Sequence, residues 1–270
     1  MNKKTKKIAL EEKYKLIEEF ISNNINQLFH DKRKEALNKF KPQSLLNKLL
    51  KKNPYLFYSL NISTAEEFIT RGLGDLTSSS DEAIFGSFLE DIAVEVVRVY
   101  RNGDKSSAGG LDAEFTDKKE NKRYFISIKS GKNWGNSSSI AKQHQAFDRV
   151  TQIYKQNKAS IIAPQPILGI CYGKWDKEES AIRKNHIEYR GQRFWEFISN
   201  DNMFYTRMIE PLKPETIDTI LDEYKKCHSK FINLMTKIFH DNFINEDGVI
   251  DWVSIIKFNS SPEEKKKLKT

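Results

Sequence analysis

Apolar residues recur three and four positions apart in several stretches of the chain, and this spacing predicts amphipathic helices. The pattern is strongest over residues 78–100, where serines and an aspartate form a helix cap before an apolar stripe. A Ser/Thr cap followed by glutamates predicts another helix start at 63–68. Further helices are predicted over 8–40, 137–156 and about 214–241. Helices are therefore expected at both ends of the chain.

Between these helices, apolar and polar residues alternate, which predicts strands. Residues 111–115 and 123–129 are two such segments, and the charged turn between them indicates an antiparallel hairpin. Residues 165–175 are apolar enough for a central strand of a sheet. The order helix, hairpin, helix, strand predicts an α/β fold with a mixed central sheet flanked by helices.

Composition adds a basic character, with 45 Lys and Arg against 37 Asp and Glu and a net charge of +8. A polyanionic partner would fit this charge, but charge alone leaves the identity of the partner open. Cys171 and Cys227 have no metal-ligand spacing and fit a reducing cytoplasm. We expect no membrane span, because no apolar run reaches about 18 residues.

Candidate chemistry concentrates on the predicted hairpin. Asp112 and Glu114 share one face of the first strand, and Ser127 and Lys129 share one face of the second, because side chains alternate. Pairing of the strands would bring a carboxylate and an ammonium together. That pair suits Mg²⁺-assisted phosphodiester hydrolysis. A cross-strand salt bridge is the structural alternative, although the apolar neighbours of Lys129 argue against a solvated position.

At these residues the chain resembles the PD-(D/E)xK nucleases, and within them the type II restriction endonucleases. Their pattern is an acid ending one strand, then an acid or serine two residues before a lysine on the next. Here fourteen residues separate Asp112 from Ser127, and "SIK" ends in Lys129. Leu111 replaces the usual proline, and Ser127 replaces the usual acid. Over roughly residues 50–200, the resemblance also rests on "NPYLF", "SSSDEAIFGSFLE", "GLDAEF", "ISIKSGKNWGNSS" and "RGQRFWEFI".

The resemblance implies a PD-(D/E)xK restriction-endonuclease-like core with additional N- and C-terminal helices. We expect residues 1–270 to form a single nuclease domain. Within it we distinguish an N-terminal helical part (1–77), a catalytic core (78–175) and a C-terminal part for DNA binding and dimerisation (176–270).

The implied activity is that of a cytoplasmic, homodimeric type II restriction endonuclease. It would make Mg²⁺-dependent double-strand cuts in double-stranded DNA at a short palindromic site, leaving 5′-phosphate ends. A cognate DNA methyltransferase would act on the same site without forming a complex. The alternatives are a repair or recombination nuclease of the same fold, and a non-catalytic DNA-binding module with a decayed site.

Because Ser127 carries no charge, a second carboxylate is expected from elsewhere. Glu90 is the first candidate, since it shares a helix face with Gly86, where a glycine leaves room for a close approach. Glu114 is the second candidate. The structural alternative for Glu90 is an exposed helix glutamate, and the alternative for Glu114 is a salt bridge. The expected metal ligands are Asp112, Glu90, the carbonyl of Ile128, and Glu114. The expected catalytic residues are Asp112, Lys129, Glu90, Ser127 and Gln143.

Gln143 would orient a water or a phosphate oxygen, or else cap a buried backbone group, with Gln145 as its rival. The glycine- and serine-rich loop after Lys129 would carry the chain onto DNA, mostly through phosphate contacts. Trp134 of this loop would either stack on DNA or pack beneath the loop. The expected DNA-binding residues are Lys132, Asn133, Trp134, Asn136 and Ser137. Two interpretations, base readout and a solvated basic face, remain for a further set of residues: Arg183, Lys184, Asn185, Arg190 and Arg193.

Overall fold

The computed structural model describes residues 3–156, 162–174, 180–182, 185–213, 217–262 and 268. The chain packs as two compact units, each built from two separated stretches. We call them the sheet unit (Met1–Phe29 with Phe85–Glu215) and the helical unit (His30–Ile84 with Thr216–Thr270). The expected single nuclease domain with successive parts 1–77, 78–175 and 176–270 stays a prediction. Burial defines the two units, because apolar side chains distant in sequence share each core.

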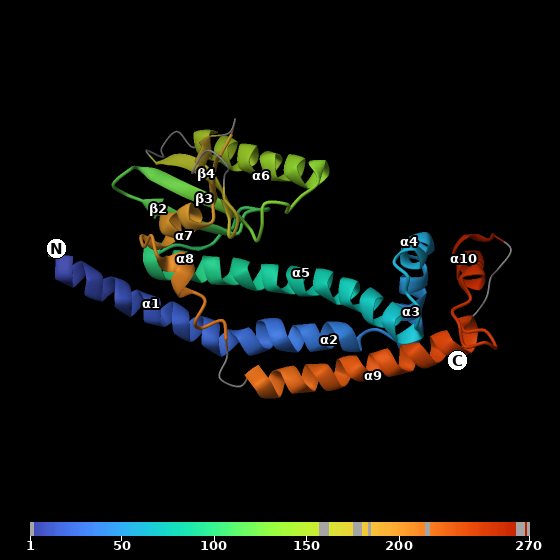
Figure 1. Ribbon diagram of the computed structural model, residues 1–270. Coiled ribbons are helices and arrows are strands. Elements are labelled where there is room, and N and C mark those ends of the chain that lie inside the picture. Colours follow the sequence, from blue (N-terminus) through green and yellow to red (C-terminus); the bar gives the residue numbers. More distant parts are fainter. Residues whose placement is uncertain are drawn as a thin grey trace. The chain divides into compact units, whose positions relative to one another are not determined.

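The sheet unit contains a mixed sheet with six strands among the described residues, in the order β1-β2-β3-β4-β6-β5 (Figure 1). β2 and β3 form the predicted antiparallel hairpin, which is confirmed. β3 pairs parallel to β4, and β4 parallel to β6. The strands are β1 (Asp104–Lys105), β2 (Ala113–Asp117), β3 (Lys122–Lys129), β4 (Ala163–Ile170), β5 (Ser180–Ile182) and β6 (Ile187–Arg190).

Helices flank this sheet and build the second unit. The predicted helix over 137–156 is confirmed, and the one at about 214–241 is observed slightly shifted. The stretch 8–40 is interrupted by a π-helix. The helices are α1 (Lys3–Ile25), η1 (Asn26–Asp31), α2 (Lys32–Asn38), α3 (Pro42–Leu50), α4 (Pro54–Ser59), α5 (Ala65–Arg101), α6 (Ser137–Gln156), α7 (Gln192–Ser199), α8 (Phe204–Arg207), α9 (Ile217–Phe243) and α10 (Trp252–Ser260).

The expected helix start at residue 78 is wrong, because α5 runs unbroken for 37 residues from Ala65. Its start is the one predicted at 63–68. The N–H of Glu67 donates to Thr64 Oγ1 at 3.1 Å, and the Glu67 carboxylate accepts the N–H of Ser63 at 3.2 Å. This reciprocal capping satisfies backbone donors at the true start, so the serines at 78–80 lie inside the helix.

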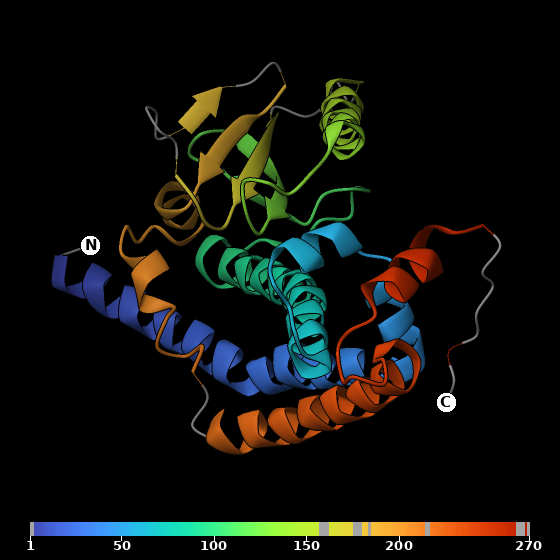
Figure 2. The same ribbon diagram turned by 45° about the vertical axis from the view of Figure 1, so that its right-hand side comes forward.

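The two faces of the sheet are covered by different helices. Figures 1 and 2 show α6 on one side and the C-terminal part of α5 on the other. On the α6 side, Phe125 and Leu168 pack with Phe147 and Val150. Leu111 also packs there, whereas Ala113 and Phe115 of β2 belong to the core on the α5 side, because Leu111 precedes the regular alternation of β2. On the α5 side the buried residues include Phe88, Ile92, Val96, Ile126, Ile128 and Ile167.

The apolar residues of α6 differ in burial: Phe147 and Val150 are buried, whereas Ile140 is 39% exposed. Within the helical unit, apolar residues of α3, α9 and the first part of α5 share a separate core. None of the helices in the described part of the chain has the length and apolar character needed to span a membrane.

β4, the strand that pairs with β3, packs very closely against α7 at one point. Gly169 pairs with Ile128 in the β3–β4 register. A Cβ at Gly169 would lie 2.0 Å from Cε2 of Phe194, far inside van der Waals contact. Phe194 is fully buried and cannot move aside without disturbing the core.

We therefore predict that Gly169→Ala lowers the free energy of unfolding by at least about 2 kcal/mol, as expected for overpacking a buried site. Urea denaturation followed by circular dichroism would measure it. Gly109→Ala is the matched control, because a Cβ there meets no atom within 4 Å. Equal stability of the two variants would contradict the rigidity of this part of the core.

Candidate active site

The hairpin brings Asp112 and Lys129 together. Asp112 directly precedes β2, and its N–H donates to the carbonyl of Ile126 at 2.8 Å. Its carboxylate Oδ2 accepts the N–H of Ile128 at 2.6 Å and lies 3.7 Å from Lys129 Nζ. Lys129 Nζ also donates to the carbonyl of Ile128 at 2.8 Å. The expected convergence of a carboxylate and an ammonium at one point of the sheet is confirmed.

Ser127 and Gln143 form a buried polar link beside this pair. Ser127 Oγ lies 2.7 Å from Gln143 Oε1 and 3.3 Å from Asp112 Oδ2. Since a hydroxyl donates one proton, the nearer amide oxygen is its principal acceptor. Gln143 Nε2 donates to the carbonyl of Gly110 at 3.3 Å. Gln143 thus caps a backbone group and ties α6 to β3 and to the segment before Asp112, whereas Gln145 is exposed.

Glu90 is half-buried on α5. Burial raises the pKa of its carboxyl above the ordinary value, Lys129 opposes the shift, and Asp112 adds to it. These electrostatic interactions indicate that Glu90 lies near both hairpin groups. Gly86, one turn earlier, supports this, because a Cβ there would lie 3.1 Å from Ser130 Oγ. The helix therefore approaches the end of β3 at a glycine, as expected.

Glu114 has partners of its own. Its carboxylate accepts from Arg123 at 2.6 Å and from Ser106 Oγ at 2.9 Å. Its side chain is only 12% exposed, so this ion pair is largely shielded from water. Glu114 shares the Asp112 face, but its ion pair lies toward the start of β3, away from Lys129. Glu114 therefore forms the salt bridge that was expected as its structural alternative.

The oxygen atoms at the hairpin suit a hard divalent cation. Asp112 Oδ1 and the Glu90 carboxylate accept no hydrogen bond from any residue that the structure describes. Over that same part of the chain, no three His, Cys, Asp or Glu side chains gather as a metal cluster. Mg²⁺ tolerates this, because it binds one or two carboxylates and keeps several waters. Asp112, Glu90 and the Ile128 carbonyl therefore fit Mg²⁺ chemically.

The loop after β3 is only partly extended into solvent. Lys132, Asn133 and Ser137 are exposed. Asn136 Oδ1 accepts the N–H of Ser139 at 3.0 Å and so caps α6. Trp134 is half-buried against the α6-side core, and its ring centroid lies 5.8 Å from Lys129 Nζ. The packed arrangement expected as one alternative for Trp134 is the one observed.

The residues considered for base readout that the structure describes form hydrogen bonds or ion pairs within the protein. Asn185 Nδ2 donates to the carbonyl of His144 and to Asp148. Arg190 pairs with Glu188, and Arg193 with Glu196. Arg183 and Lys184 lie outside the described residues.

Sequence reasoning missed the environment of Cys171. Its N–H donates to the carbonyl of Lys129 at 2.8 Å, and its thiol is buried. Burial raises the pKa of this thiol, and the charge of Glu90 adds to the shift. The residue lies beneath the site as a neutral packing group, which its position within the predicted central strand 165–175 could have indicated.

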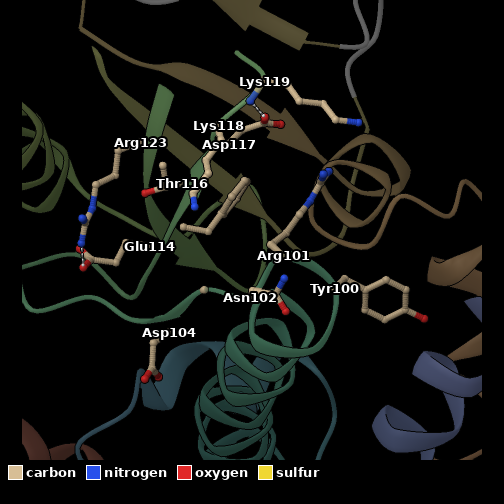
Figure 3. Close-up of a pocket in the computed structure, with 12 residues that line it drawn as sticks. Tyr100, Arg101, Asn102, Asp104, Glu114, Thr116, Asp117, Lys118, Lys119 and Arg123 are labelled. Carbon is tan, nitrogen blue, oxygen red and sulfur yellow. Dashed lines mark hydrogen bonds and ion pairs between the residues drawn. The ribbon is translucent and has the colours of Figure 1, made fainter. Parts of the chain in front are cut away.

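A cavity of about 1020 Å³ also opens on the sheet unit, but at the opposite end of the hairpin (Figure 3). Thr116 and Asp117 of β2 line it, together with the C-terminal end of α5. The figure shows the Glu114–Arg123 ion pair at one side of it. Neither Asp112 nor Lys129 lines this cavity, so it is separate from the hairpin site.

A mixed sheet whose antiparallel hairpin presents an acid and a lysine, between helices on both faces, places the protein among the restriction-endonuclease-like α/β cores. The family model described as Type II restriction endonuclease EcoO109I matches residues 15–219. That match spans most of the chain and includes Asp112 and Lys129, so the chain belongs to this family. No curated protein matches the chain.

Glu90 is half-buried and accepts no hydrogen bond from the residues that the structure describes, so its charge should weaken the metal-free fold. Because its pKa is raised in the folded state, stability falls as pH rises from the ordinary carboxyl value through the raised one. We predict that Glu90→Gln raises the melting temperature in EDTA at about pH 7, and that the gain shrinks toward about pH 4. Glu82→Gln, an exposed glutamate of the same helix, is the control. A variant less stable than wild type at neutral pH would contradict the prediction.

Proposed function

We propose that the protein is a homodimeric, Mg²⁺-dependent type II restriction endonuclease that cuts both strands of a short palindromic DNA site and leaves 5′-phosphate ends. The observation that carries this proposal is the 3.7 Å approach of Lys129 to Asp112 on the hairpin, in a chain of the EcoO109I family. Site symmetry follows from protein symmetry, because a two-fold dimer presents the same surface to two half-sites.

In this proposal, Asp112, Glu90 and the Ile128 carbonyl hold Mg²⁺. When bound, the ion polarises a phosphate oxygen and lowers the pKa of a bound water. Glu90 replaces the charge that Ser127 lacks, and its raised pKa supports this, because a desolvated carboxylate without a protein donor gains most from a nearby cation.

Lys129 is the group that faces the reacting phosphate. Its ammonium is held by the Ile128 carbonyl and by Asp112, so its position is set before DNA arrives. A positioned ammonium offsets the negative charge that develops on the phosphate during hydrolysis. Ser127 and Gln143 have a different role, since their hydrogen bonds to each other and to Gly110 hold the hairpin in register.

The loop after β3 supplies the proposed DNA contacts. Lys132 and Asn133 are exposed next to the hairpin site and can donate to phosphate oxygens. Asn136, Ser137 and the packed Trp134 shape the loop, so their contribution is mainly to its conformation. The free cysteines Cys171 and Cys227 agree with a cytoplasmic protein, where a cognate methyltransferase would protect the same site without forming a complex.

Two other functions share parts of this site. A repair or recombination nuclease would have the same hairpin but recognise DNA structure, and a DNA-binding module with a decayed site would retain only affinity. Incubation of the protein with plasmid and Mg²⁺ separates the three. Discrete bands support the restriction enzyme, general degradation supports the structure-specific nuclease, and retardation without cutting supports the binding module.

We predict that Lys129→Ala abolishes plasmid cleavage while specific DNA binding, measured by gel retardation, remains. The reason is that the ammonium acts on the charge of the reaction more than on ground-state affinity. Lys122→Ala is the matched control, because Lys122 starts the same strand and pairs with Glu120 on the surface. Cleavage by Lys129→Ala within about tenfold of wild type would remove Lys129 from the mechanism.

We also predict that Glu90→Gln slows cleavage at least ~10²-fold, the usual effect of losing an acid–base group or a metal ligand. Ser127→Ala should slow cleavage much less. Mg²⁺ should raise the melting temperature of wild type but not of Asp112→Asn or Glu90→Gln, because binding to the folded state stabilises it.

The comparison with Glu114→Gln decides which acid supplies the second carboxylate. That variant breaks the pair with Arg123 and should lose stability while keeping the Mg²⁺-dependent rise in melting temperature. If the rise disappears in Glu114→Gln and survives in Glu90→Gln, Glu114 is the ligand and the assignment of Glu90 is wrong.

A further inference from the structure

Tyr172 is a large aromatic residue held in an exposed position beside the hairpin site. It lies two residues after the end of β4, and 58% of its surface is exposed. Its N–H donates to the carbonyl of Ser130 at 3.0 Å, continuing the parallel pairing of β3 and β4 beyond the ends of both strands. In this continued register Tyr172 lies across from Gly131, two residues after Lys129.

The backbone around Tyr172 fits closely against its ring. A Cβ at Gly131 would lie 2.5 Å from both Cζ and Oη of Tyr172, so the ring lies directly on the backbone of Gly131. Gly173 has a φ of +98° and Gly191 a φ of +52°, conformations that glycine adopts most readily. A Cβ at Gly191 would also lie 2.5 Å from the carbonyl oxygen of Gly173. These contacts fix the segment that carries the ring.

Packing alone does not account for this residue. The ring contacts Gly131 at its far end but remains mostly in solvent, so it buries little apolar area. Its hydroxyl makes no hydrogen bond to the residues that the structure describes. Neither core packing nor a buried hydrogen bond therefore explains a large aromatic side chain on a segment this constrained.

The surroundings of Tyr172 favour nucleic acid as the partner. Lys132, exposed on the facing loop, has its Cβ 3.9 Å from the position of a Cβ on Gly173. A fixed aromatic ring beside a lysine offers one surface for a sugar or base and one charge for a phosphate. Lys129 is two residues before Gly131, so a nucleotide on this ring would lie near the reacting phosphate.

We propose that Tyr172 packs its open ring face against the nucleotide next to the scissile phosphate and thereby positions DNA over Lys129. The inference rests on the proposed endonuclease function and adds a DNA contact to it. Tyr172 is a positioning residue for the reaction, since the chemistry itself belongs to the hairpin groups.

The first test compares cleavage of a cognate oligonucleotide by four variants. Tyr172→Ala should lower kcat/KM about tenfold or more, the scale of losing an aromatic contact to a base. Tyr172→Leu should lose nearly as much, because it keeps bulk without the aromatic face. Tyr172→Phe should cut like wild type, because the hydroxyl has no hydrogen-bond partner among the described residues. Tyr205→Ala on α8, another exposed tyrosine, is the matched control.

The second test uses Gly131→Ala, whose Cβ would displace the Tyr172 ring. This variant should lose activity in the wild-type background and cost little more in the Tyr172→Ala background, because both changes remove one contact. An abasic nucleotide at the contacted position should likewise impair wild type but not Tyr172→Ala. Circular dichroism melts of each variant establish that the fold is intact.

The outcomes separate the two proposals. Absence of cleavage by wild type overturns the endonuclease function and this inference with it. Wild-type cleavage with Tyr172→Ala and Tyr172→Leu both within about twofold of it overturns the role of Tyr172 alone. Additive losses in the Gly131→Ala and Tyr172→Ala double variant also overturn it, because the two residues would then act independently.

Discussion

The 2.6 Å hydrogen bond from the N–H of Ile128 to the Asp112 carboxylate is the contact around which the site is arranged. It joins the residue before β2 to the backbone of β3, so the register of the hairpin also sets where the carboxylate points. The same register places Lys129 3.7 Å from that carboxylate. A shift by one residue would turn Lys129 to the other face and separate the two charges.

Charge at this site is distributed differently from the pattern that the family resemblance implies. Ser127 contributes a buried hydroxyl, which Gln143 engages at 2.7 Å. A further carboxylate, that of Glu90 on α5, lies close enough for Lys129 and Asp112 to influence its pKa. Such a carboxylate costs stability in the metal-free protein, because burial penalises its charge and Asp112 repels it. A bound cation would offset both effects, so stability and metal binding are expected to change in opposite directions when Glu90 is replaced.

Close approaches at glycines determine what surrounds the hairpin. Gly86 lets α5 reach Ser130, Gly131 receives the ring of Tyr172, and Gly169 accommodates Phe194 beneath the β3–β4 pair. Each approach is too close for an added methyl group without a shift of its neighbour. The positions of Glu90 and Tyr172 relative to Lys129 therefore depend on contacts between elements that are distant in the sequence.

Local periodicity was enough to predict α6, the antiparallel hairpin and the convergence of Asp112 with Lys129, because strand alternation and turn chemistry act over a few residues. It misplaced the start of the long helix, since a serine run resembles a cap wherever it occurs, whereas the cap formed by Thr64 and Glu67 starts the helix earlier. Only tertiary structure showed the division into two units and the exposed ring of Tyr172 against Gly131. These features arise from burial and from contacts between distant segments, which spacing along the chain does not encode.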